Sequence, residues 1–291
     1  MSSRHPTPKG VPASAADQAL RPVSAELSRL TARDLWLIDL LDEHQVLATE
    51  HIASLGFTSL HTARNRLALL HQRGVLARFR IHVPAGTQPY RWCLGYLAAC
   101  YLAERDGRPV PRQATVQARV DRLSARSDLQ HLLGANGFFV DLAYHARHNT
   151  GTALNAWWSE TGIRRRNATG DGLRPDGYGH WQHDGRHRQF WLEYDRGTET
   201  TKRVIAKLDG YARLHRVLQY DHAICIRMQT LRQENELHTR LTTHPAVTGG
   251  LLTVASMSGH GHPAGTVWRI AGSDPSRRWR LAELPSPGAS P

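Results

Sequence analysis

The stretch 173–211 constrains the fold of this chain more than any other, because it combines a tight turn with three carboxylates. Two runs rich in aromatic and branched residues flank Asp184-Gly185, a dipeptide suited to a two-residue type I′ hairpin loop. Pairing symmetrical about that loop places Asp176 opposite Glu193, on one face of the sheet, where like charges repel. Asp195 follows Glu193 by two residues and is expected to point the same way.

Three carboxylates on one patch of sheet predict a cation that offsets their repulsion. Mg²⁺ is a hard ion that takes oxygen ligands, and Mn²⁺ would substitute for it. Glu160, at the end of the preceding expected strand, is a further candidate ligand. The predicted metal ligands are therefore Asp176, Glu193, Asp195 and Glu160.

The balance of charge favours a polyanionic partner. The chain has 37 basic and 25 acidic residues, a formal charge of +12, which favours nucleic acid before a membrane surface. Its three cysteines have no metal-ligand spacing and suit core positions in a reducing compartment. The start of the chain lacks an apolar signal region, and the longest apolar stretch, 96–103, is far shorter than the ~20 residues that span a bilayer. We expect a cytoplasmic protein with no membrane partner.

The N-terminal part predicts three short helices followed by a hairpin. Residues 1–28 have no hydrophobic period and predict a disordered arm. Thr31 is the expected N-cap of a first helix, Thr49 caps a second that Gly56 ends, and Ser59 starts a third that Gly74 stops. The buried positions expected on the first and third helices are Leu35, Ile38 and Leu41, and Leu60, Ala63, Leu67 and Leu70.

The strand expected after the third helix alternates from residue 75 to residue 83. The expected inward residues are Val75, Ala77, Phe79, Ile81 and Val83, and the outward residues are Arg78, Arg80 and His82. A return strand is expected over 90–94. Three helices and a basic hairpin are the outline of a winged helix-turn-helix, whose third helix enters the major groove of DNA. The predicted DNA-contacting residues are Ser59, His61, Thr62, Arg64, Asn65, Arg66, Arg78 and Arg80. The alternative is a helical cap whose polar face merely meets water.

The remainder of the chain predicts a mixed α/β layer domain. The expected elements are a helix over 96–104, a helical region over 114–148 with breaks at Ser127 and near Gly134, a strand over 154–160, the hairpin, a helix over 200–215, a strand over 222–228, a helix over 234–242, a strand over 250–257 and a final hairpin. The expected divisions are an arm over 1–28, a winged helix over 29–106, a linker and helix over 107–126, a mixed-sheet domain over 127–284 and a tail over 285–291.

This order of elements is that of the PD-(D/E)xK nuclease core, a restriction-endonuclease-like fold. The match places Pro175-Asp176 on the second strand and Glu193-Tyr194-Asp195 on the third. A metal ion there would lower the pKa of a water and neutralise charge on the phosphate being cut. Asp195 stands where this superfamily most often carries a lysine. Lys207 and Lys202 lie on the next helix, and Lys207, beside the apolar face, is better aimed at the sheet. The predicted catalytic residues are Asp176, Glu193, Asp195, Lys207 and Lys202; the alternative is that both lysines are solvated.

The chain resembles the replication-relaxation family of actinobacterial plasmids and integrative elements over roughly 30–228. The resemblance rests on L-T-A-R-D, V-L-A-T-E-H-I-A-S-L-G-F, A-R-N-R-L-A-L-L-H-Q-R-G-V-L-A-R-F, W-W-S-E, L-R-P-D-G and F-W-L-E-Y-D-R-G-T-E. It implies a protein that handles the DNA of a mobile element in replication or relaxation, with replication or transfer proteins as further candidate partners. A homodimer on a palindromic site would suit a wing of this size.

Three functions are compatible with these residues. The first is a Mg²⁺-dependent endonuclease delivered to DNA by the winged helix. The second is a non-catalytic winged-helix replication or transcription factor with a degenerate nuclease-like domain. The third is an adaptor whose arginine-rich surface binds an acidic protein.

Overall fold

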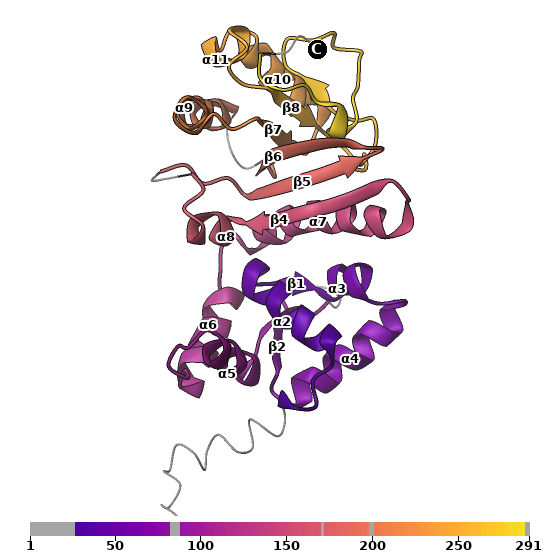
Figure 1. Cartoon of the computed structure of the whole chain (residues 1–291), viewed down its shortest axis with the longest axis vertical. Coiled ribbons are helices and arrows are strands. Elements are labelled where there is room, and N and C mark those ends of the chain that lie inside the picture. The colour runs from indigo at the N-terminus through magenta and orange to yellow at the C-terminus, as the bar shows by residue number, and fades with distance from the viewer. Residues whose placement is uncertain (1–26, 82–87, 170–171, 198–200, 289–291) are drawn as a thin grey trace, which may run out of the picture.

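A computed structural model describes residues 27–81, 88–169, 172–197 and 201–288. Most of the expected arm and the last residues of the expected tail lie outside these ranges, as do His82 and Val83. The described part is a mixed α and β structure with one three-stranded and one six-stranded sheet (Figure 1). None of its helices is both long enough and apolar enough to cross a lipid bilayer.

The N-terminal part builds a core from helices packed against a small antiparallel sheet of strand order β1-β3-β2. Its elements are α2 (Ala32–His44), β1 (Leu47–Ala48), α3 (Thr49–Gly56), α4 (Leu60–Gln72), β2 (Leu76–Phe79), β3 (Arg91–Leu94) and α5 (Tyr96–Arg105). The expected inward positions Ile38, Leu41, Ala63, Leu67 and Leu70 are fully buried. Leu35 and Leu60 are half-buried.

Two of the three predicted helix caps are confirmed. Thr31 forms a capping box with Asp34, and the Ser59 hydroxyl accepts the N–H of Thr62 at 3.1 Å. The prediction for Thr49 is wrong, because Ala48 is the N-cap of α3 and makes no side-chain hydrogen bond there. The Thr49 hydroxyl instead donates to the Tyr90 carbonyl and accepts the indole N–H of Trp92 at 2.9 Å. A buried indole that needs an acceptor therefore determines the role of this threonine.

Strand β2 is shorter than the alternation predicts, and its first residue and the residue before it are both buried. Val75 and Leu76 are each 1% exposed, so strict alternation fails at this point. Ala77, Phe79 and Ile81 are half-buried against a second small cluster. That cluster also contains Val46, Cys93, Val120, Leu123, Leu129 and Leu133. The helix that follows residues 106–112 thus packs, through Val120 and Leu123, on the face of β2 that carries Ala77 and Phe79.

The predicted helical region over 114–148 consists of α6 (Gln113–Ser124) and α7 (Leu129–His148), with the expected break at Ser127. The expected break near Gly134 is wrong, because α7 continues through it. The Tyr194 ring packs directly on Gly134, and a Cβ there would meet ring atoms at 2.4 to 2.7 Å. Glycine is present at this position for close approach between α7 and the sheet, and not as a helix breaker.

We expect Gly134→Ala to lower the free energy of unfolding by about 1–3 kcal/mol, because the added methyl group overpacks the contact with Tyr194. Gly137→Ala is the matched control on the same helix, since its Cβ would meet His51 at 3.4 Å, close to ordinary contact. Urea unfolding of both variants checks the prediction. Equal stabilities would show that Tyr194 moves aside without cost.

The C-terminal part is a six-stranded mixed sheet of order β4-β5-β6-β7-β8-β9, in which β6, β7 and β8 are parallel to one another. Its elements are β4 (Thr152–Ser159), α8 (Glu160–Arg165), β5 (Gly177–His183), β6 (Arg186–Tyr194), α9 (Thr201–Leu218), β7 (His222–Arg227), α10 (Leu231–Leu241), α11 (Pro245–Thr248), β8 (Val254–Met257), β9 (Arg269–Ile270) and a 3₁₀ turn (Leu281–Glu283). Helix α7 and the C-terminal segment cover one face, and α9, α10 and α11 cover the other (Figure 1).

The predicted central hairpin is confirmed. Asp184 and Gly185 have φ values of 48° and 78°, as a type I′ loop requires, and Gly177 pairs with Leu192 as the symmetrical register predicts. The expected final hairpin is wrong in its detail. Trp268 and Trp279 form an isolated bridge, whereas β9 pairs with β8 and the segment after it turns into a 3₁₀ helix. The short helices α8 and α11 were not predicted.

His44, the last residue of α2, joins the N-terminal part to the sheet. It is 3% exposed and stacks on Trp157 of β4 with 3.6 Å between ring centroids. Burial, followed by the charges of Arg166 and Arg165, lowers the pKa of His44 to about 3. An unfolded histidine has a pKa of about 6.5, so as the pH falls the unfolded chain takes up this proton first.

We therefore expect the stability contributed by neutral His44 to be present above about pH 6.5 and lost towards pH 3. The loss amounts to about 1.4 kcal/mol per pH unit between the two pKa values. Urea unfolding of wild type and His44→Phe at pH 7 and pH 5 checks this, with a smaller loss expected for the variant. His260→Phe, at an exposed loop position, is the control. Identical pH dependence in His44→Phe and wild type would contradict the expectation.

Candidate functional site

Glu193 lies near the end of β6 and is the most enclosed of the predicted site carboxylates. It is 4% exposed, and both of its oxygens have partners on α9. The Tyr211 hydroxyl donates to Oε1 at 2.6 Å, and Lys207 Nζ donates to Oε2 at 2.5 Å. Lys207 and Tyr211 are four residues apart, so they project from one face of the helix.

Asp176 immediately precedes β5 and is held against the end of β6. Its Oδ2 accepts the backbone N–H of Tyr194 at 2.7 Å. Its Oδ1 lies 2.8 Å from Nε2 of His131, which comes from α7. Contacts from two elements, the end of β6 and α7, therefore fix this carboxylate.

The electrostatics of Glu193 reflect a nearby second carboxylate. Burial, followed by the charge of Asp176, raises the pKa of Glu193 to about 7, while Lys207 and Tyr211 act in the opposite direction. Burial and then the charge of Glu193 raise the pKa of the Tyr211 hydroxyl. The cation of Lys207 therefore does not fully offset the combined effect of burial and the charge of Asp176 on Glu193.

The other predicted site residues lie in different surroundings. Strand alternation predicts that Asp195 shares the face of Glu193; Asp195 lies one residue beyond the end of β6. Its Oδ1 accepts the N–H of Gly197 at 2.7 Å, and its own N–H donates to the Arg227 carbonyl. Glu160 was placed at the end of a strand but is the first residue of α8. The side chain of Lys202 lies outside the described residues.

Asp176 and Glu193 are the residues that could hold a metal ion. Within the described ranges, no group of three or more His, Cys, Asp or Glu side chains converges as a metal site. Mg²⁺ is usually bound through only one or two carboxylates and keeps several waters, so a pair is sufficient. Burial, followed by the charge of Asp176, raises the pKa of Glu193, and a divalent cation between the two carboxylates would favour their charged forms. The donors present thus fit Mg²⁺ in type and charge.

Sequence reasoning missed the two residues that position these carboxylates. Tyr211 lies one helical turn after Lys207 in the sequence, and a buried hydroxyl that needs an acceptor is the available signal. His131 carried no such signal, because only the packing of α7 on the sheet brings it to Asp176.

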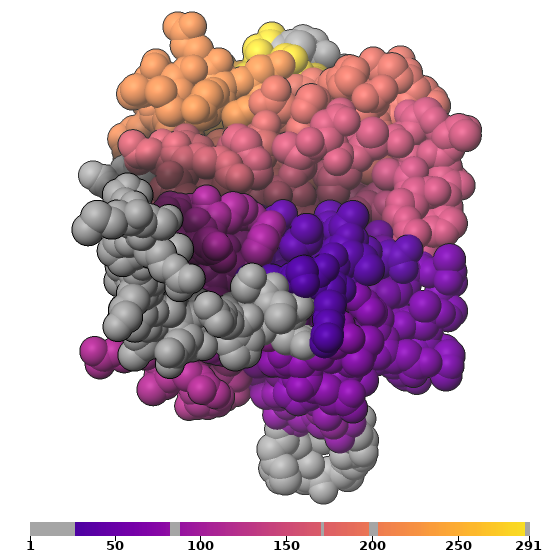
Figure 2. All heavy atoms as spheres, turned by 60° about the horizontal axis from the view of Figure 1, so that its bottom comes forward, coloured from indigo at the N-terminus to yellow at the C-terminus, as the bar shows by residue number. Residues whose placement is uncertain are grey.

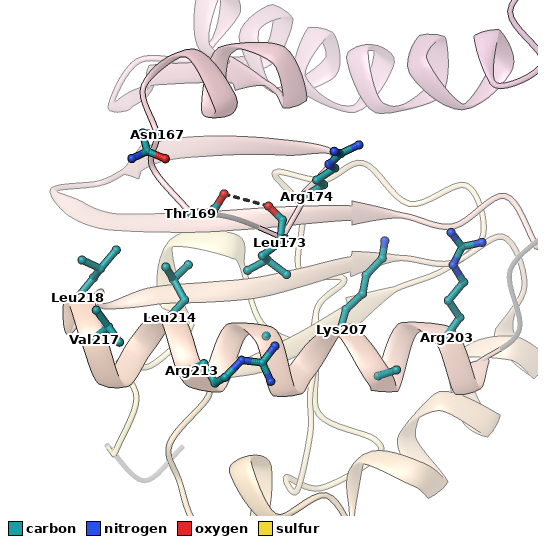
Figure 3. Close-up of a pocket in the computed structure, with 13 residues that line it drawn as sticks. Asn167, Thr169, Leu173, Arg174, Arg203, Lys207, Arg213, Leu214, Val217 and Leu218 are labelled. Atoms are coloured by element: carbon teal, nitrogen blue, oxygen red, sulfur yellow. Dashed lines mark hydrogen bonds between the residues drawn. The ribbon is translucent and has the colours of Figure 1, made fainter.

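A groove of about 740 Å³ lies beside this site, between α9 and the segment that leads into β5 (Figure 3). Four of its lining side chains are cationic, namely Arg174, Arg203, Lys207 and Arg213. A hydrogen bond of 2.9 Å from the Thr169 hydroxyl to the Leu173 carbonyl shapes the wall opposite α9.

Four of the residues predicted to contact DNA on α4 and at its N-cap are exposed, and two, Ser59 and Arg66, make contacts within the protein. His61, Thr62, Arg64 and Asn65 are exposed, and the His61 ring and the Asn65 amide share a contact of 3.0 Å. The N-terminal part that carries them faces the viewer in Figure 2. Ser59 is occupied as the helix cap.

Arg66 is not available to DNA in the same way, because it pairs with the buried Asp34 of α2. Its Nε donates to Asp34 Oδ1 at 2.8 Å, and its Nη2 contacts the other oxygen. Burial acts to raise the pKa of Asp34, but hydrogen bonds from Arg66 and Thr31 outweigh it and the pKa is lowered. Arg66 therefore joins α4 to α2.

Arg78 and Arg80 lie on and just after β2 and cover the ring of Tyr90. Their guanidinium carbons are 4.0 and 3.8 Å from the ring centroid. Stacking of this kind holds a guanidinium flat while its N–H groups remain directed outwards. Both side chains thus present donors beside β3.

A family of known proteins matches most of this chain. None of the curated proteins matches this chain. The model of the replication-relaxation family matches residues 38–224, which include the elements that carry Asp176, Glu193 and Lys207. Since this match covers more than half of the sequence, the chain belongs to the replication-relaxation family.

Proposed function

We propose that this protein binds the DNA of a plasmid or integrative element, in its replication or relaxation, and cuts one strand in a Mg²⁺-dependent reaction. The observation that carries the proposal is the meeting of Asp176, Glu193 and Lys207 where β5 begins and β6 ends. Family membership supports the part concerning replication or relaxation.

In this proposal the N-terminal part is a winged helix-turn-helix. Helix α4 enters the major groove, where the exposed His61, Arg64 and Asn65 offer hydrogen bonds to base edges. Arg78 and Arg80 contact phosphates from the wing. The overall charge of +12 supports a polyanionic partner.

The C-terminal part acts as a PD-(D/E)xK-type nuclease domain. Asp176 and Glu193 would hold Mg²⁺, which supplies a Lewis acid and lowers the pKa of a bound water. Tyr211 fixes the orientation of the Glu193 carboxylate, and His131 fixes that of Asp176. Lys207 takes the place of the strand lysine common in this superfamily and directs its ammonium group to the phosphate that is cut.

Incubation of the purified protein with supercoiled plasmid tests the proposal. We expect conversion to open circles with Mg²⁺ or Mn²⁺ and none with EDTA. Wild-type protein that leaves the plasmid supercoiled with both metals would remove the catalytic part.

A second candidate function is a DNA-binding factor without catalysis. It is favoured by one observation, that all four oxygens of Asp176 and Glu193 already have protein partners. This function requires duplex binding that is unchanged by EDTA and weakened steeply by salt. Gel shifts at two salt concentrations, combined with the plasmid assay, distinguish the two candidates.

A further inference from the structure

The charge of the groove beside the site indicates what could occupy it. None of its described lining residues is acidic, although four are cationic. Lys207 also contacts Glu193, and the other three cations of the groove are arginines. Four clustered cations in a concave surface attract an anion with several negative charges.

The groove is cationic at one end and apolar at the other. Arg203 and Lys207 rise from α9 towards Arg174, whereas Leu214, Val217 and Leu218 lie further along the same helix (Figure 3). Val217 is 77% exposed and Leu218 is 42% exposed. An occupant that carries both phosphates and apolar rings would contact both ends.

The size of the groove favours a short single strand over a duplex. Its volume of about 740 Å³ lies within the roughly 300–1,000 Å³ range of small-ligand pockets. A double helix is too wide to enter such a space, whereas a single strand offers separate phosphates and unstacked bases. Proteins that bind single strands combine a positively charged groove with side chains, usually aromatic, that contact the base faces; in this groove the aliphatic Leu214, Val217 and Leu218 would make those contacts.

The cationic end of the groove leads to the carboxylate pair. Arg174 is separated from Asp176 only by Pro175, and Lys207 contacts Glu193 directly. A phosphate bound between Arg174 and Lys207 would therefore lie next to both carboxylates.

From this arrangement we propose that the groove binds single-stranded DNA and directs its backbone to Asp176 and Glu193, an inference that rests on the proposed function. Arg174, Arg203 and Arg213 contact the phosphates of the strand. The exposed leucine and valine side chains of α9 contact its sugars and bases. The strand that is cut is thus held separately from the duplex bound by α4.

Fluorescence anisotropy with a short labelled oligothymidylate, in EDTA, tests the proposal on the full chain. We expect Arg174→Ser combined with Arg213→Ser to weaken binding about tenfold or more. The slope of log affinity against log salt should become shallower by roughly 1.4, at about 0.7 for each lost phosphate contact. Arg216→Ser combined with Arg232→Ser removes equal charge from exposed positions outside the groove and should leave affinity within about twofold.

The outcomes distinguish a failure of the groove proposal from a failure of the proposed DNA-cutting function. Arg64→Ala should weaken duplex binding and leave oligothymidylate binding unchanged. Because the assay contains no divalent metal, a protein that fails to nick plasmid can still confirm the groove. Equal weakening by the groove and control variants, or no binding of oligothymidylate by wild type at low salt, would overturn the proposal. A similar fall in duplex affinity for the groove variant would overturn the assignment to single strands.

Discussion

Glu193→Gln is expected to lower the rate of Mg²⁺-dependent plasmid nicking by about 100-fold or more. Glutamine keeps the size of the side chain; its amide oxygen can accept a proton of Lys207 while its NH2 group donates to the Tyr211 oxygen. What it removes is the negative charge that would hold the metal ion, and loss of a metal ligand typically costs at least 10–100-fold. Nicking rates and calorimetric Mg²⁺ titrations of the two proteins measure the effect.

The control for this variant is Asp209→Asn, which removes a carboxylate that is 70% exposed on the same helix. It should nick plasmid at the wild-type rate and bind Mg²⁺ with unchanged affinity. Glu193→Gln should also remain folded, because burial already favours the neutral form of this side chain. Nicking by Glu193→Gln at the wild-type rate would exclude Glu193 as a ligand and leave the non-catalytic function.

Arg66→Ala is expected to lower the free energy of unfolding by roughly 2–4 kcal/mol. Asp34 is 1% exposed, so removal of its partner leaves a buried carboxylate without a counterion. The hydrogen bonds from Thr31 remain, and they keep the expected loss from being larger. Urea unfolding at pH 7 measures the loss.

Arg64→Ala is the matched comparison, because Arg64 is an exposed residue on the same helix. Its stability should change by less than about 0.5 kcal/mol, while its affinity for duplex DNA should fall. Testing the two changes in separate variants distinguishes lost DNA contacts from lost structure. If Arg66→Ala proves as stable as Arg64→Ala, the pair with Asp34 contributes nothing to the N-terminal core.

Local sequence rules were sufficient for the hairpin and for most of the helices. Asp184-Gly185 predicts its own loop, because two consecutive residues with positive φ require residues that tolerate that conformation. The side-chain period of two then fixes which residues face each other along β5 and β6. Thr31 and Ser59 likewise act on backbone N–H groups only three residues away.

The same rules failed where a distant residue determines what a side chain does. Thr49 looks like a cap, but Trp92 needs its hydroxyl as an acceptor. Gly134 looks like a helix break, but it allows Tyr194 to approach α7. Alternation predicts a third carboxylate beside Glu193, but Asp195 accepts the N–H of Gly197, and no three such side chains converge within the described residues.

In the candidate site, too, local sequence rules predict some of the residues and the tertiary structure supplies the others. The sequence by itself determined the chemistry near the end of the hairpin, because turn geometry and strand period bring Asp176 towards Glu193, and helix period aims Lys207 at the sheet. Only the tertiary structure decided which partners complete the site, since His131 on α7 and Tyr211 on α9 reach it from opposite sides of the sheet. The physical reason is that backbone preferences act over a few residues, whereas burial of charge depends on whatever the fold packs around it.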